Sequence, residues 1–98
     1  MICYFVSRHA GAVEWIAGQS VRIDETVAHL DLERVRSGDT VVGTLPAHLA
    51  AEVCRRGARY LHLIIDMPAQ ARGRELDTEA MVRHGARLEE YVVQRRLP

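Results

Sequence analysis

Apolar residues dominate three short runs along this chain, over residues 2–6, 40–45 and 60–66, and the first of them is uninterrupted. The runs are rich in β-branched and aromatic residues and lack helical spacing, which is typical of strands covered on both faces. We therefore predict a strand in each run. The segment between the first two runs is ambiguous between a brief strand over residues 27–30 and a turn of helix after Asp31.

Two segments between these runs carry helical spacing instead. The first covers residues 12–17 and ends at Gly18. The second covers residues 46–56, where Pro46 stands in the first turn because its missing N–H would have had no helical partner. Gly57 supplies the stop for this second helix.

The last part of the chain predicts a long C-terminal helix over residues 78–95, capped by Asp77. Its apolar positions recur at the spacing of one helical face, which we expect to lie against the sheet or a partner subunit. These positions are Met81, His84, Leu88, Tyr91 and Val92.

A strand, a helix and a strand follow one another between residues 40 and 66, which indicates a βαβ unit with parallel pairing and a right-handed crossover. Residues 1–98 are expected to form a single domain. Its predicted class is α/β: a small three-layer Rossmann-like domain with a mostly parallel sheet of three or four strands and the long C-terminal helix. Because so short a chain buries a marginal core, we also expect a homodimer.

The charge of the chain excludes several functions. The formal net charge is +0, so no overall field attracts duplex nucleic acid or an acidic membrane, and any anion site must be local. All 13 basic residues are arginine, which excludes a Schiff-base lysine or a phosphate-loop lysine. A phosphate would have to bind arginine, histidine, hydroxyl or backbone N–H groups.

The cysteines and histidines show no metal-binding spacing. Cys3 and Cys54 lie far apart in apolar surroundings and are interpreted as buried thiols in a reducing cytoplasm. No metal ion or other cofactor is predicted, because no zinc motif is present. The apolar runs are too short to span a bilayer and the N-terminus lacks the pattern of a secretion signal, so we expect a cytoplasmic protein without a membrane partner.

Candidate binding residues follow each predicted strand. In an open parallel sheet, ligands bind at the carboxyl ends of the strands. The helix that begins near Pro46 would direct unpaired N–H groups toward the same edge, which favours a phosphate. The residues at this edge are Ser7, Arg8 and His9 after the first strand, Gly43, Thr44 and Leu45 after the second, and Asp66, Met67 and Pro68 after the third.

Each candidate also has a plainer interpretation. Ser7 could merely cap a helix, and Arg8 could be a solvated residue at the rim. A threonine before a helix, such as Thr44, is more often a cap than a ligand contact. Asp66 could form a turn, and beside a phosphate it would have to hold an arginine or abstract a proton.

Residues outside the strand ends give weaker signals. Arg72 and Arg74 could close over an anion as a basic lid, or could simply belong to a solvent-exposed loop. Trp15 could stack on a base, although a tryptophan at this helical spacing is more often a core residue. His62 alternates within a strand and is expected as a core or interface residue, whereas His29, His48 and His84 have no visible partners in the sequence.

Three segments taken together carry a resemblance: YFVSRHAGAVEW, GDTVVGTLPAHLAAEVCRRGARYLHLIIDMP and RGREL. With them the chain resembles a family of small CRISPR-associated accessory proteins of type III systems, the one numbered sixteen in the Csx series. The resemblance spans nearly the whole chain. It implies a CARF-like Rossmann domain that binds cyclic oligoadenylate.

The resemblance also implies an activity, that of a ring nuclease that linearises cyclic tetraadenylate and so switches off antiviral signalling. A ribose 2′-OH would attack the adjacent phosphorus without a metal ion and leave a 2′,3′-cyclic phosphate. Ser7, Arg8 and His9 are the expected catalytic residues: Arg8 would neutralise phosphoryl oxygens, His9 would protonate the leaving oxygen or simply hold a phosphate, and Ser7 would donate to nonbridging oxygens, as would Thr44.

Two other functions remain open on the sequence. A non-catalytic module that binds cyclic oligoadenylate, as a sponge or a sensor, would need the same fold, dimer and basic rim. A generic Rossmann-type phosphoryl enzyme would use Asp66 with Mg²⁺ and would lose its activity in chelator.

Overall fold

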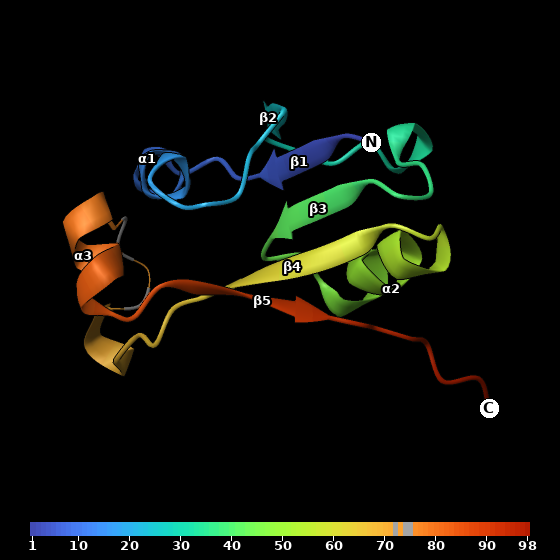
Figure 1. The fold of residues 1–98 in the computed structure, drawn as a ribbon. Coiled ribbons are helices and arrows are strands. Elements are labelled where there is room, and N and C mark those ends of the chain that lie inside the picture. Colours follow the sequence, from blue (N-terminus) through green and yellow to red (C-terminus); the bar gives the residue numbers. More distant parts are fainter. Residues whose placement is uncertain (72, 74–75) are drawn as a thin grey trace.

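The fold is a five-stranded sheet with helices on both faces, seen in a computed structural model that describes residues 1–71, 73 and 76–98 (Figure 1). The strand order is β2-β1-β3-β4-β5. β1 pairs in parallel with β2 and β3, β3 pairs in parallel with β4, and β5 runs antiparallel to β4. The strands are β1 (Cys3–Val6), β2 (Glu25–Val27), β3 (Thr40–Gly43), β4 (Arg59–Ile64) and β5 (Arg87–Tyr91). The small Rossmann-like α/β class that the sequence predicts is therefore confirmed.

The helices of the described chain are short. They are α1 (Ala10–Ala17), α2 (Ala47–Arg55) and α3 (Thr78–Arg83), with 3-10 turns η1 (Leu32–Arg34) and η2 (Ala69–Ala71). In this part of the chain, none is long and apolar enough to cross a membrane.

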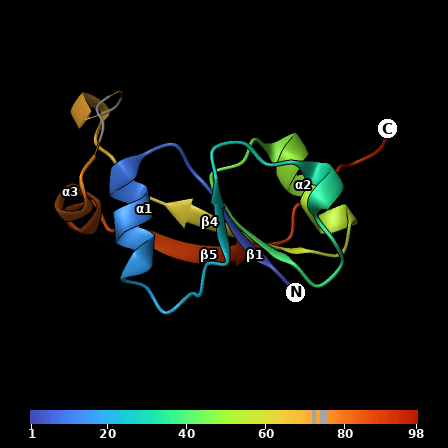
Figure 2. The ribbon, with the colours of Figure 1, turned by 90° about the horizontal axis from the view of Figure 1, so that it is seen from above.

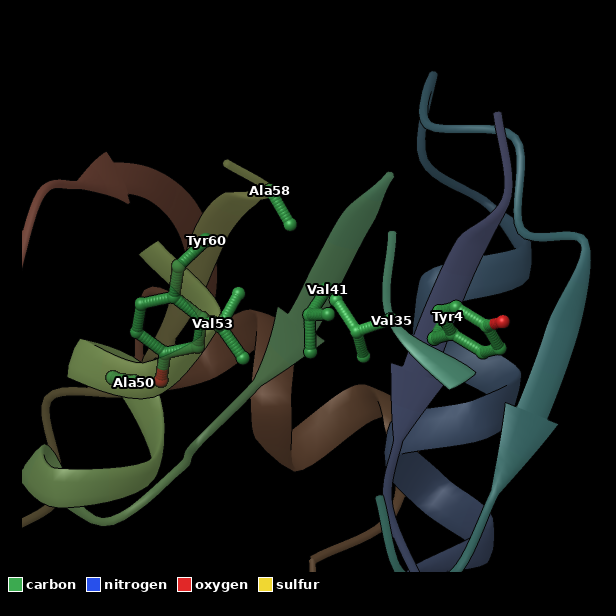
Figure 3. Packing of buried hydrophobic residues seen from close by; sticks show 7 residues of the cluster. All are labelled: Tyr4, Val35, Val41, Ala50, Val53, Ala58 and Tyr60. Atoms are coloured by element: carbon green, nitrogen blue, oxygen red, sulfur yellow. The ribbon is translucent and has the colours of Figure 1, made fainter. Parts of the chain in front are cut away.

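Two hydrophobic clusters lie on the two faces of the sheet, because successive strand residues point to opposite faces. α2 covers one face and α1 the other (Figure 2). The cluster under α2 holds Tyr4, Val35, Val41, Ala50, Val53, Ala58 and Tyr60 (Figure 3). The cluster under α1 and α3 holds Phe5, Ala12, Trp15, Ile16, Val42, Leu63 and Met81. The core interpretation of Trp15 is thus confirmed, and its side chain is 4% exposed.

The prediction of one long helix over residues 78–95 is wrong. Asp77 does cap α3, since its Oδ1 accepts from the N–H of Ala80 at 2.8 Å. The helix ends at Arg83, because Gly85 adopts a φ of +71°. The N–H of Gly85 donates to the carbonyl of Val82, and the next amide, that of Ala86, donates to the carbonyl of Met81. These two bonds form a Schellman motif, and the chain then turns back along β4 as β5.

The sheet is also larger than the three or four strands predicted. β5 adds a strand at one edge, and the ambiguous segment supplies β2 at the other. Both interpretations of that segment are partly right, since a strand forms over Glu25–Val27 and a 3-10 turn forms after Asp31. The Asp31 carboxylate starts the turn by accepting from the N–H of Glu33 at 3.1 Å.

Candidate functional site

The chain reverses its direction across the sheet between β1 and β3. From β1 it passes through α1 to β2 on one side, and from β3 it passes through α2 to β4 on the other. α1 and α2 lie on opposite faces, so the loops that follow β1 and β3 diverge at the carboxyl edge (Figure 2). Such a switch point is where open α/β sheets hold ligands. The two strands end together, because Val6 pairs with Gly43.

A cavity of about 200 Å³ opens at this switch point. Its polar lining comes from both loops, with Ser7 and His9 after β1 and Gly43 and Thr44 after β3. The rest of the lining is apolar: Val6, Ala12, Leu63, Ile65, Met67, Leu76 and Met81. The structure therefore brings four of the candidate residues into one cavity, on the face of the sheet that α1 and α3 cover.

The loop after β1 separates its three polar residues. The N–H of Ser7 donates to the carbonyl of Val27 at 2.9 Å, which ties the start of the loop to β2. The N–H of His9 donates to Ser7 Oγ at 3.1 Å. Ser7 and His9 are alternate residues that both line the cavity, whereas Arg8 between them is exposed and lies outside its lining. Arg8 thus shares the loop but not the cavity wall.

His9 is also the N-cap residue of α1, and its side chain makes no cap hydrogen bond. The carbonyl of His9 accepts from Ala12 and Val13, so the amides of the first turn, at residues 10 and 11, have no helical partner. A Cβ on Gly11 would lie 2.0 Å from the carbonyl oxygen of Leu76. Glycine therefore lets the start of α1 pack directly on the segment before α3, and these two elements form one wall of the cavity.

The loop after β3 approaches β1 just as closely. A Cβ on Gly43 would lie 2.9 Å from the carbonyl oxygen of Val6, so glycine is needed where the two strands end. Thr44 follows with an exposed side chain and does not cap α2, whose N-cap is Pro46. Leu45 turns away from the cavity and packs against the cluster under α2. Of these neighbours, Thr44 is the one that presents a hydroxyl to the cavity.

Asp66 lies at the carboxyl end of β4 but outside the cavity lining. Its Oδ2 accepts from Arg87 Nη1 at 2.9 Å, and its N–H donates to the carbonyl of His84. This hydrogen bond raises the pKa of Arg87. Of the interpretations left open for Asp66, the structure shows the one in which it holds an arginine. Two further candidates, Arg72 and Arg74, lie outside the described residues.

Apart from Met67, which follows the third predicted strand, the apolar residues of the lining were not predicted from the sequence, although a signal was present. Leu63, Ile65 and Met67 alternate along the strand and past its end, so they face the same side. Met81 belonged to the predicted apolar stripe, but nothing in the sequence placed it beside β4.

The structure also shows that Cys3 and Cys54 are free, half-buried thiols, and burial raises the pKa of Cys3. Among residues 1–71, 73 and 76–98, no three His, Cys, Asp or Glu side chains form a group suited to a metal ion.

Fold and cavity together define a small Rossmann-like α/β domain with a candidate ligand site at its topological switch point. Residues 4–94 match the model of a protein family described as "Putative CRISPR-associated protein (Cas_VVA1548)". Because the match covers most of the chain, this protein belongs to that CRISPR-associated family. No curated protein and no solved structure matches the chain.

Proposed function

We propose that this protein is a metal-independent ring nuclease that opens cyclic tetraadenylate and so ends type III CRISPR signalling. The observation that carries the proposal is the cavity at the β1–β3 switch point, lined by Ser7, His9 and Thr44, in a chain of a CRISPR-associated family. Hydroxyl and imidazole groups at this edge suit a phosphodiester, and the amides at the start of α1 and α2 add donors for its oxygens.

The size of the cavity determines how such a ligand would bind. Ligand pockets commonly enclose roughly 300–1,000 Å³ for a drug-sized molecule. A cavity of about 200 Å³ with a mainly apolar lining suits one base rather than a ring of four nucleotides. The remainder of the ring would then lie across the open edge, where Thr44 and Arg8 are exposed. Arg8 would contact a phosphate from outside the cavity wall.

The proposed reaction balances without a co-reactant. The ribose 2′-oxygen forms a bond to phosphorus and loses its proton, the bond from phosphorus to the 5′-oxygen breaks, and that oxygen gains a proton. His9 is proposed as the acid that supplies this proton. Because Ser7 Oγ already accepts from the His9 amide, its own O–H is available to donate to a nonbridging oxygen. Thr44 and Arg8 would stabilise the same developing charge.

A homodimer is part of this proposal. A ring of four nucleotides has two-fold symmetry, so two copies of the switch point could contact equivalent phosphates on opposite sides of the ring. Sedimentation with and without the ring should then show one ring per two chains. A stoichiometry of one ring per chain would contradict the proposed dimer.

The deciding experiment incubates the protein with cyclic tetraadenylate in excess chelator and identifies the products by chromatography and mass. Linear adenylates with 2′,3′-cyclic phosphate ends are expected. A ring that stays intact but co-elutes with the protein would replace the proposal with a sponge or sensor. Activity that chelator abolishes would favour the metal-dependent phosphoryl enzyme instead.

Single substitutions then test the proposed roles. We expect Arg8→Ala to weaken binding and to slow cleavage by roughly 10 to 1,000-fold, with Arg22→Ala, whose side chain is 92% exposed, as the matched control. His9→Ala should slow cleavage with affinity largely kept, and His29→Ala serves as its control. If affinity collapses in His9→Ala, this residue holds the ligand and is not the acid.

A further inference from the structure

The Tyr60 hydroxyl contacts three groups in the loop and strand beside the cavity. Its ring is 2% exposed and lies in the cluster under α2 (Figure 3). The hydroxyl oxygen accepts from the N–H of Leu45 at 2.9 Å and lies 3.1 Å from the carbonyl oxygen of Gly43. It also lies 2.6 Å from Nδ1 of His62, two residues along β4. Its partners in the loop therefore come from both sides of Thr44.

The position of these partners fixes the backbone of Thr44. The carbonyl of Gly43 belongs to the peptide group before Thr44, and the N–H of Leu45 belongs to the peptide group after it. A single buried hydroxyl thus holds both peptide planes that flank the residue. The N-cap residue of α2 is Pro46, and no side chain caps this helix. The Thr44 hydroxyl therefore does not hold this loop by capping α2. Tyr60 therefore contacts the backbone on both sides of the residue whose hydroxyl lines the cavity.

The three contacts also limit where the protons can lie. A phenol has one proton to donate and two lone pairs that accept. The N–H of Leu45 occupies one lone pair, and the phenolic proton can go either to the carbonyl of Gly43 at 3.1 Å or to His62 Nδ1 at 2.6 Å. All three contacts are hydrogen bonds at once only when the carbonyl of Gly43, which can only accept, takes this proton. The remaining lone pair faces His62 Nδ1, which must then donate. Burial raises the pKa of Tyr60, which keeps the phenol protonated and able to fill this role.

We infer that Tyr60 is a positioning residue for Thr44, and that neutral His62 carries its proton on Nδ1 rather than on Nε2, the form that free histidine favours. The consequence for cleavage rests on the proposed function. The hydrogen-bond network itself does not. Its two parts can therefore be tested separately, first in the protein without any ligand.

The first measurement is the nitrogen NMR spectrum of the His62 ring, recorded where the imidazole is neutral. Nδ1 is expected to show the shift of a protonated ring nitrogen and Nε2 that of an unprotonated one. Tyr60→Phe keeps the buried ring and removes the hydroxyl, and should return His62 toward the Nε2–H form. Tyr91→Phe is the matched control, because the Tyr91 ring also contacts His62, at 5.8 Å between centroids, while its hydroxyl donates to Glu89. An Nε2–H ring in the unmodified protein would overturn the inference.

The second measurement is hydrogen exchange at the Leu45 amide. Loss of one ordinary hydrogen bond should speed its exchange by about tenfold in Tyr60→Phe. Tyr91→Phe should leave it unchanged, and amides of the buried β3 strand report any general loss of stability. Equal exchange at Leu45 in both variants would mean that Tyr60 does not hold the loop.

Cleavage supplies the third measurement. If Tyr60 positions Thr44 for the transition state, Tyr60→Phe should lower kcat by about tenfold with little change in KM, while Tyr91→Phe keeps both values. Should the unmodified protein fail to open the ring, the proposed function fails, yet the NMR and exchange results still decide the network. A normal kcat in Tyr60→Phe with a released Leu45 amide would overturn the positioning role.

Discussion

Two junctions in this molecule share the same local sequence and the same geometry but lead to different strands. After α2 the chain continues through Gly57 into β4, and after α3 it continues through Gly85 into β5, and each glycine is followed by alanine and arginine. The two glycines adopt φ values of +83° and +71°. At both, the glycine amide and the next amide bond back to the last turn of the helix, which forms a Schellman motif.

The difference lies in the residues that follow. Behind Gly57 come Tyr60 and Leu63, which are buried on opposite faces, and β4 lies inside the sheet. Behind Gly85 only Leu88 of β5 is half-buried, and β5 lies at the edge. The glycine thus ends the helix at both junctions. The polarity of the residues that follow it determines whether the next strand lies inside the sheet or at its edge.

The arginine that follows each junction, Arg59 or Arg87, forms an ion pair with an acidic residue on the other side of the β4–β5 ladder. Arg59 Nη2 lies 2.8 Å from Glu90 Oε1, and Arg87 Nη1 lies 2.9 Å from Asp66 Oδ2. Each ion pair joins a residue of one strand to a residue two positions away from its directly opposite partner on the other strand, and the two pairs lie toward opposite ends of the β4–β5 ladder. Both pairs are therefore compatible with the observed pairing of β4 with β5. The edge strand is thereby held by charges as well as by backbone hydrogen bonds.

The largest expected effect comes from removing the anchor of the second junction. Met81 is 1% exposed and fastens the six-residue α3 to the cluster with Phe5 and Trp15. Met81→Ala should lower the free energy of unfolding by about 2–5 kcal/mol, because it leaves a cavity in that cluster. Urea denaturation measures the loss. Val82→Ala, at a side chain 64% exposed, is the control and should change little. Equal losses in the two variants would mean that α3 is not anchored through Met81.

The next effect separates the two glycines. Gly57→Ala should cost about 3 kcal/mol, because strain at positive φ adds to a Cβ placed 2.7 Å from Ser37 Oγ. Gly85→Ala should cost about 1 kcal/mol, since its Cβ would meet Asp66 Oδ2 at 3.4 Å and Arg87 Nη1 at 3.8 Å, both ordinary contacts, and the cost is mainly strain. Thermal or urea unfolding of both variants provides the comparison.

A third glycine gives the control for that comparison. Gly73 has a φ of +81°, and among the residues that the structure describes, a Cβ on it would meet nothing within 4 Å. Gly73→Ala should therefore be the mildest of the three substitutions. If Gly57→Ala proves no worse than Gly73→Ala, the contact with Ser37 contributes nothing and the two junctions do not differ in this respect.

The smallest effect concerns acid. Hydrogen bonds from Arg59 hold the pKa of the Glu90 carboxyl below its ordinary value. The folded chain then binds fewer protons than the unfolded chain, so this pair stabilises the fold above the ordinary glutamate pKa of about 4.3 and its contribution is lost as the pH falls through the lowered pKa. Glu90→Gln should make stability fall less steeply below about pH 4.3, and added salt should shrink the difference. Glu14→Gln, at an exposed residue of α1, is the comparison, and an equal slope in both would remove the pair as the cause.

The fold could be predicted where one signal dominated. The runs that became β1, β3 and β4 are apolar on both faces, and the helix stop at Gly57 precedes an unmistakable strand. The same stop at Gly85 precedes residues whose spacing leaves helix and strand open, since Leu88 and Tyr91 are three apart, which fits a helix, while Leu88 and Val92 are four apart, which fits both. Pairing with β4 settles this ambiguity, and such long-range pairing is not visible in the local sequence.

The candidate site was predictable to the same degree. Strand ends identify Ser7, His9, Gly43 and Thr44, because the carboxyl edge of a parallel sheet gathers them whatever the strand order. Sequence could not separate Arg8 from its neighbours, since that depends on how the loop after β1 is held by Val27. The sequence also could not show that Asp66 forms an ion pair with Arg87, because the prediction placed Arg87 in a helix over residues 78–95 and not on a strand beside β4.

The two edges of the sheet are blunted in different ways, and this limits how copies of the chain can associate. β2 is only three residues long, and β5 exposes Arg87, Glu89 and Glu90 along its length. Short or charged edges resist the addition of a foreign strand, which protects against aggregation. A second copy should therefore not extend the sheet, and the proposed homodimer would have to form through packing of side chains from helices and loops.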